Sequence, residues 1–101
     1  MIPSLAKLLD ELANAAPGVQ VATSNGSTTW ARGTRAFAAV TPWGVELRLD
    51  RAIAAAATRT PDTGPSPRGP EWVRFNPREL DGHAVDRVTA WLDLAYRRAA
   101  G

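Results

Sequence analysis

A single histidine, His83, would have to carry any chemistry that needs an imidazole in this chain. Asp81 and Asp86 lie near it in sequence, and two carboxylates favour a protonated imidazole. No HExxH, GxGxxG or P-loop sequence occurs, and no serine lies in a nucleophile-elbow pattern. The ordinary interpretation of His83 is a surface or capping residue at the start of a helix. The sharper hypothesis makes it part of a small-molecule or catalytic site.

Paired carboxylates are the second possible route to catalysis. Glu71, Glu79, Asp81 and Asp86 are close in sequence, but each also fits a helix cap or a loop charge beside an arginine. The 101 residues include no cysteine, which excludes disulfides, thiolate nucleophiles and Cys-based metal sites. We therefore assign no catalytic residue, metal site or cofactor, and expect a non-catalytic protein.

Arginines give the chain its basic character, although the formal net charge is only +2. Arg32, Arg35 and Arg48 are predicted to gather at one end of a strand meander, where they could contact phosphates. Glu46 and Asp50 lie among them and would lower the local potential. A salt-bridged rim and a weak DNA- or RNA-binding surface therefore both remain open.

Four tryptophans could stack on nucleic-acid bases, but their positions favour packing. Trp30 and Trp91 fall on predicted core faces, and Trp72 begins a predicted strand. Only Trp43, in a predicted hairpin turn, is expected to be exposed, either as a contact residue or as a lid on the edge of the core.

Helices are predicted at both ends of the chain and in its middle. Leucines spaced three and four apart predict a helix over 4–15, with Ser4 as its N-cap. Asp50 is expected to cap an Ala-rich helix over 51–58, and Asp81 or Gly82 to open the last one.

Turn residues predict an antiparallel meander between the first two helices. Asn25-Gly26 favours a two-residue hairpin that places Val21 opposite Trp30. A turn at Gly33-Thr34 would place Trp30 opposite Phe37, and a three-residue turn over 42–44 would pair Phe37 with Leu49. The predicted core face comprises Val19, Val21, Trp30, Phe37, Ala39, Val45, Leu47 and Leu49.

The opposite face of this meander is predicted to be small and mildly apolar instead of polar. Such a surface lets another sheet or helix approach closely, so we expect a homodimer or an unidentified protein partner there. The predicted interface comprises Ala22, Ala31, Ala36, Ala38, Val40 and Trp43.

Residues 60–70 are rich in proline and glycine and are predicted to form a connecting loop before a short strand over 72–75. Arg68, between Pro67 and Gly69, would lie at the apex of this loop as a possible anion or partner contact. A rigid crossover is the alternative interpretation.

The predicted order is α-β-β-β-β-α-β-α in a single domain over 1–101. It indicates a two-layer α+β fold, with an antiparallel sheet of about five strands and helices packed on one face. The N-terminal apolar run is interrupted by Asp10 and Glu11, and no stretch has the roughly 20 apolar residues of a membrane-spanning helix. We expect a cytoplasmic protein.

Four segments resemble the MmcQ/YjbR-like family of small α+β proteins: RGTRAFAAV (32–40), VELRLD (45–50), EWVRF (71–75) and AWLDLAYRRA (90–99). The chain departs from the family where a lysine is common and Thr34-Arg35 stands here, and in its Pro-rich loop. The resemblance implies a secretion-chaperone-like topology and DNA binding as a function to consider. It implies no established activity.

Overall fold

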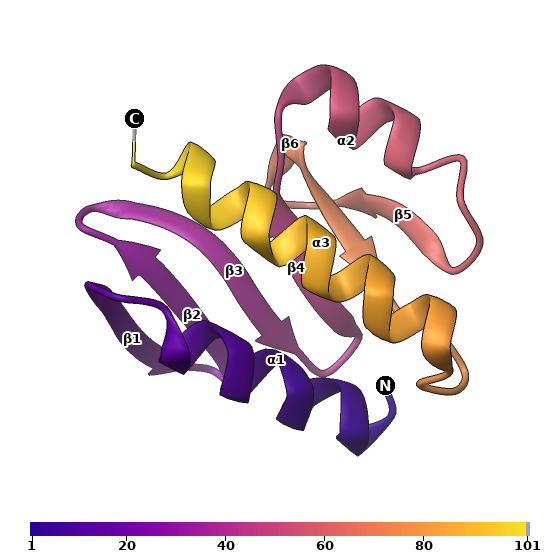
Figure 1. Ribbon diagram of the computed structural model, residues 1–101, viewed down its shortest axis with the longest axis horizontal. Coiled ribbons are helices and arrows are strands. Elements are labelled where there is room, and N and C mark those ends of the chain that lie inside the picture. Colours follow the sequence, from indigo (N-terminus) through magenta and orange to yellow (C-terminus); the bar gives the residue numbers. More distant parts are fainter. Residues whose placement is uncertain (101) are drawn as a thin grey trace.

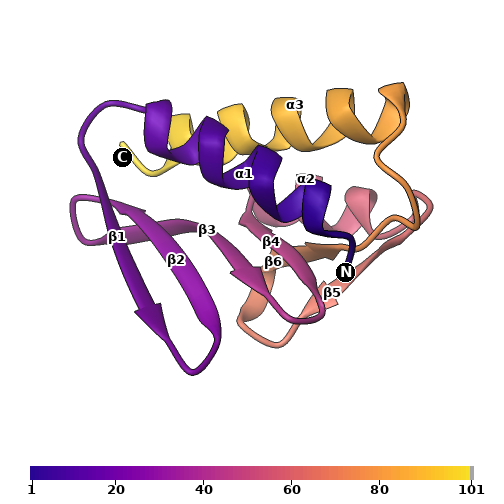
Figure 2. The same ribbon diagram turned by 90° about the horizontal axis from the view of Figure 1, so that it is seen from below.

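The computed structural model describes residues 1–100 as a two-layer α+β domain with three helices and one open antiparallel sheet of six strands (Figure 1). Along the sheet the strand order is β1-β2-β3-β4-β6-β5. Helices α1 and α3 cover β3 and β4, and α2 packs against β6 (Figures 1 and 2). The elements are α1 (Pro3–Ala15), β1 (Val19–Ser24), β2 (Ser27–Arg32), β3 (Arg35–Thr41), β4 (Gly44–Arg48), α2 (Arg51–Ala57), β5 (Thr63–Ser66), β6 (Gly69–Phe75) and α3 (Gly82–Arg98).

Helix capping follows the sequence at two of the three helices. The carboxylates of Asp50 and Asp81 accept hydrogen bonds from the first turns of α2 and α3. The predicted cap of α1 is wrong, because Ser4 lies inside the helix. Ile2 takes the N-cap position with no side-chain bond, and Pro3 begins the helix, since proline lacks the N–H that would go unbonded there.

The first hairpin has the predicted register, with Val21 opposite Trp30. Asn25 and Gly26 both have positive φ, 52° and 77°, as a type I′ turn requires. The next pairing differs from the prediction. A β-bulge between β2 and β3 places Trp30 opposite Ala38 and leaves Phe37 without a direct partner on β2.

The turn between β3 and β4 is also one residue shorter than predicted. Thr41 pairs with Gly44, and the Thr41 hydroxyl accepts from the Trp43 N–H and donates to the Gly44 carbonyl. Together with the bulge, this shift places Ala38 opposite Leu47 and Ala39 opposite Glu46. Ala38 therefore joins the core face, and Ala39 lies on the outer face, the reverse of the prediction.

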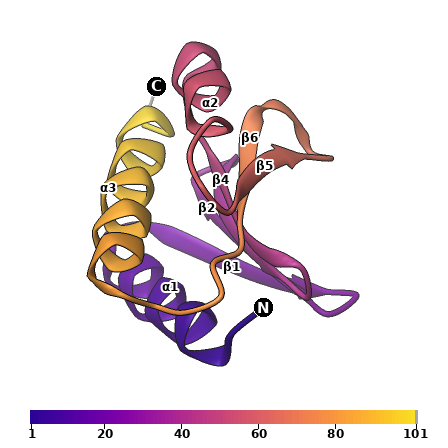
Figure 3. The same ribbon diagram turned by 90° about the vertical axis from the view of Figure 1, so that its right-hand side faces the viewer.

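The Pro-rich segment over 60–70 is not a loop throughout. Its second half forms a hairpin in which β5 pairs with β6 and Pro67-Arg68 make the turn (Figure 3). Proline is accepted in β5 because this strand lies at the edge of the sheet. The sheet thus has one strand more than expected.

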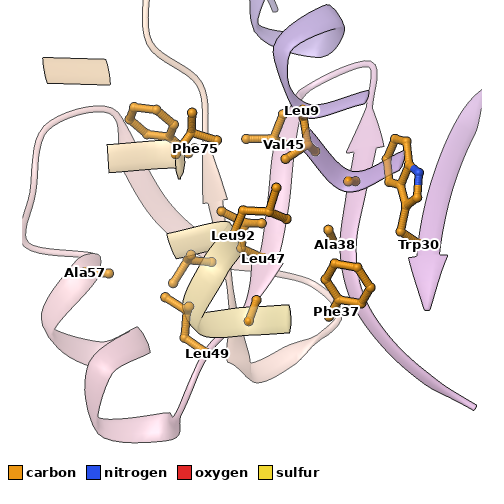
Figure 4. Close-up of a cluster of buried hydrophobic side chains, with 14 of the residues drawn as sticks. Leu9, Trp30, Phe37, Ala38, Val45, Leu47, Leu49, Ala57, Phe75 and Leu92 are labelled. Carbon is orange, nitrogen blue, oxygen red and sulfur yellow. The ribbon is translucent and has the colours of Figure 1, made fainter. Parts of the chain in front are cut away.

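The core lies between the sheet and the helices α1 and α3 (Figure 4). Phe37 packs edge-to-face against Tyr96, with ring centroids 5.5 Å apart. The Trp30 indole N–H donates to the Asn14 side chain at 2.9 Å, which anchors α1 to β2. Val21, predicted in the same row as Trp30, is 51% exposed, because α1 and α3 make at most slight contact with β1.

Candidate functional site

The predicted interface face is only partly present. Ala22 is exposed, and Ala31 and Ala36 are half-buried on the outer face. Ala38 is fully buried and Val40 packs against the core cluster, so their assignment to the outer face is wrong. The bulge at Phe37 turns both residues inward.

Trp43 is 64% exposed at the tip of the β3–β4 turn, as expected. The Arg74 guanidinium lies 5.7 Å from the centre of its ring. Trp72 also packs beneath an arginine, since the Arg68 guanidinium is 5.3 Å from its ring centre. Both tryptophans therefore border a charged cluster on the outer face.

Glu46 is the centre of that cluster, and sequence reasoning did not identify it as such. Glu46 is 1% exposed, and its carboxylate accepts from Arg68 at 2.7 Å, from Ser66 at 2.8 Å and from Arg74 at 3.1 Å. Arg68 lies in the turn between β5 and β6, near the predicted apex, but its guanidinium is held by an ion pair with Glu46. The pairing of Arg74 with Glu46 across β4 and β6 was not visible without the sheet order.

The pKa of Glu46 reflects two opposing effects. Burial acts to raise the pKa of this carboxyl, but the hydrogen bonds from Arg68 and Ser66 and the charge of Arg74 outweigh it, and the pKa is lowered. The ionised Glu46 of β4 therefore holds Ser66 and Arg68 of the β5–β6 hairpin. A general acid needs the opposite shift.

A second arginine cluster lies where β3 begins and α3 ends. Arg48 donates to one oxygen of Glu71 at 2.9 Å, and Arg98 donates to the other. The hydrogen bonds from Arg48 lower the pKa of Glu71 most, which keeps this carboxyl ionised. Arg32 stacks on Tyr96, 4.2 Å from the ring centre, and donates to its carbonyl.

A cavity of about 290 Å³ opens beside this cluster. Arg35, Arg48 and Arg98 line its sides, and Phe37 and Ala95 contribute apolar surface. The structure thus brings two of the three predicted phosphate-contact residues, Arg35 and Arg48, into one cavity. Arg98, at the far end of the sequence, was missing from the prediction because no local pattern links it to the meander.

His83 is exposed at the start of α3 beside a cavity that Asp81 and Arg87 also line. Residues 1–100 contain no group of three or more histidines, cysteines or acidic residues that could hold a metal ion. A larger open groove, about 640 Å³, runs along α3 and is lined by Leu12, Phe37 and Tyr96. Asp86 and Asp93 also line this groove, and Asp93 forms an ion pair with Arg97 at 3.1 Å.

The β1 edge is the remaining feature that could bind a partner. Its burial pattern runs from half-buried Val19 to exposed Ser24, and only β2 makes more than slight contact with it. The tip of the β1–β2 hairpin projects away from the helical layer (Figure 2). Unlike the two arginine clusters, this strand presents main-chain groups as its binding surface.

None of the helices described within residues 1–100 is both long and apolar enough to cross a membrane. Comparison with known proteins adds no family: no family model, no curated protein and no solved structure matches this chain.

Proposed function

We propose that this chain is a non-catalytic protein-interaction domain that self-associates through the β1 edge strand. The observation that supports this most strongly is the exposed state of β1, a six-residue strand that makes no more than slight contact with any element except β2. Exposed edge strands offer a row of main-chain donors and acceptors to another chain.

The turn geometry determines which groups of β1 are available. A type I′ turn closes with a hydrogen bond between Ser24 and Ser27, and hydrogen-bonded pairs then alternate along the hairpin. Val19, Val21 and Thr23 therefore direct their N–H and C=O groups away from β2. These three residues can pair with a new strand without breaking any bond of the domain.

The two edges of the sheet contrast sharply. At the β5 edge, Gly64 and Pro65, a bulge and a length of four residues all hinder strand addition. The β1 sequence VQVATS contains no charge, no proline and no glycine, and its pairing with β2 has no bulge. Of the two edges, only β1 suits pairing.

A second copy of the chain is the partner that β1 fits best. Two β1 strands can pair antiparallel about a two-fold axis at Val21, which uses the three outward-facing residues of each copy for about six main-chain hydrogen bonds. The same pairing brings the two half-exposed Val21 side chains together. Ala22 lies next to this contact on the outer face, so the arrangement retains one part of the interface predicted from sequence.

Analytical ultracentrifugation with matched lysine variants tests this proposal. We expect wild type to dimerise as its concentration is raised to about 1 mM, which is the dissociation constant of a weak complex. Val21→Lys should remain monomeric over the same range. Ile53→Lys charges another exposed apolar residue, which lies on α2. Because α2 packs against β6, at the other end of the strand order from β1, this variant should dimerise like wild type.

A wild-type chain that stays monomeric throughout this range contradicts the proposal. So does a dimer that Ile53→Lys dissociates and Val21→Lys leaves intact, because the interface would then lie near α2 and away from β1.

A further inference from the structure

We infer that the arginine-lined cavity between the beginning of β3, the end of β4 and the end of α3 is a binding site for a phosphate monoester group. Its three cationic side chains, from Arg35, Arg48 and Arg98, come from three different elements and line the same cavity of about 290 Å³. The inference does not depend on self-association, because none of these residues lies on β1.

Charge at this cavity strongly favours an anion. Arg48 and Arg98 share a single carboxylate, Glu71, and no acidic residue among 1–100 forms a salt bridge with Arg35. Arg32, which pairs with Arg35 across β2 and β3, adds a fourth guanidinium nearby. The three guanidinium groups that line the cavity therefore face one carboxylate, and the remaining charge of +2 is what a dianion would balance.

Unused hydrogen-bond donors point to an oxyanion in particular. Each guanidinium carries five N–H bonds. Arg48 donates to Glu71 through Nε and Nη2, and Arg98 donates to it through Nη2, so both retain donors for another acceptor. Arg35 is exposed and makes no side-chain hydrogen bond within the part of the chain that the structure describes. A tetrahedral phosphate can accept several such bonds at once.

The site is held in place before any ligand binds. Glu71 fixes two of the guanidinium groups, and the backbone of β6 places it by accepting a hydrogen bond from Leu49 N–H at the Glu71 carbonyl. Preorganised side chains lose less conformational entropy on binding. The cavity volume, at the lower limit of small-ligand sites, suits a phosphate with a small substituent and not a bulky ligand.

Titration with inorganic phosphate, followed by backbone amide chemical shifts at pH 7.5, tests this site. We expect saturable 1:1 binding with shifts concentrated at Ala36 and Ala99, and binding of acetate at least about tenfold weaker, since it offers fewer acceptors and one charge fewer. Arg35→Gln should weaken phosphate binding roughly tenfold or more without changing the unfolding midpoint.

The matched control is Arg97→Gln, which removes the same charge from a neighbouring side chain that is 75% exposed and paired with Asp93 outside the cavity. It should change the phosphate affinity less than about twofold, as expected for a screened surface charge. Non-saturable shifts, or equal losses in Arg35→Gln and Arg97→Gln, would overturn the site.

Duplex DNA provides the remaining arm. A duplex of about 20 base pairs would overturn the inference if it bound more tightly than phosphate, lost affinity steeply with salt and was weakened equally by both variants. Such a result would assign anion binding to a broad basic surface and not to the cavity.

Discussion

Glu46→Gln is the substitution whose effect follows most directly from the packing of the outer face. Glu46 is 1% exposed, and its carboxylate accepts from two guanidinium groups and one hydroxyl. A glutamine keeps the shape but removes the charge, and its amide nitrogen is repelled by the same donors. Arg68 and Arg74 would then lack a counter-charge in a largely closed site.

The magnitude follows from burial. Removing one partner of a fully buried ion pair costs about 3–5 kcal/mol, but the side chains of Arg68 and Arg74 are 31% and 27% exposed and can be partly solvated. We therefore expect a loss of about 2–3 kcal/mol in the free energy of unfolding. For a domain of this size that is a drop of roughly 8–24 °C in Tm.

Urea unfolding at pH 7, monitored by tryptophan fluorescence, measures this loss. Glu71→Gln is the matched control, because Glu71 also binds two arginines but lies at a more exposed position. We expect it to lower the unfolding midpoint less than Glu46→Gln does. Adding Arg68→Gln to Glu46→Gln should recover part of the loss, since it removes a stranded charge. A Glu46→Gln midpoint equal to wild type, or a larger loss in Glu71→Gln, would refute the reasoning.

Three further outcomes are expected. Because the pKa of Glu46 is lowered in the folded state, its stabilising contribution is complete above pH 4.5, the pKa of the unfolded chain, and declines as pH falls through the folded pKa. The urea midpoint should therefore fall less with decreasing pH in Glu46→Gln than in wild type. Gly44→Ala should cost about 2 kcal/mol or more, since φ is +153° and a Cβ would lie 2.8 Å from a main-chain oxygen of β6, whereas Gly64→Ala, with open space around it, should change the urea midpoint little. Asn14→Ala should cost about 1–2 kcal/mol in the same assay, because it leaves the buried Trp30 N–H without its acceptor; an unchanged midpoint would show that water replaces the amide.

Turn chemistry made part of the fold predictable. Asn25-Gly26 specified both the type and the register of the first hairpin, and Asp50 and Asp81 were identifiable as caps. The α+β class followed from the order of the elements. These features depend on the turn and capping preferences of residues that are close in sequence.

The bulge at Phe37 could not be predicted from the sequence. Alanines surround this residue at 36, 38 and 39, and such small side chains give no signal of which face they occupy. The same ambiguity sent Ala38 and Val40 to the wrong face of the sheet. A strand with alternating large and polar residues would have fixed the register.

The arginine clusters were only half predictable, because they depend on contacts between distant segments. Arg98 reaches Glu71 across 27 residues, and Arg74 reaches Glu46 across 28. The sequence shows the charges but not the β4–β6 pairing that brings one pair together or the course of α3 that brings the other. Arg68 seemed free for the same reason.

Hydrogen exchange of the β1 amides tests the central claim, self-association through this edge, most directly. Val19 and Val21 direct their N–H groups outward, whereas the amides of Gln20 and Ala22 bond β2 and serve as internal controls. The account predicts that the Val19 and Val21 amides exchange rapidly in dilute protein and become protected as concentration rises, while Gln20 and Ala22 are protected throughout. Rapid exchange at Val21 that does not depend on concentration, in a sample that is dimeric by ultracentrifugation, would contradict it.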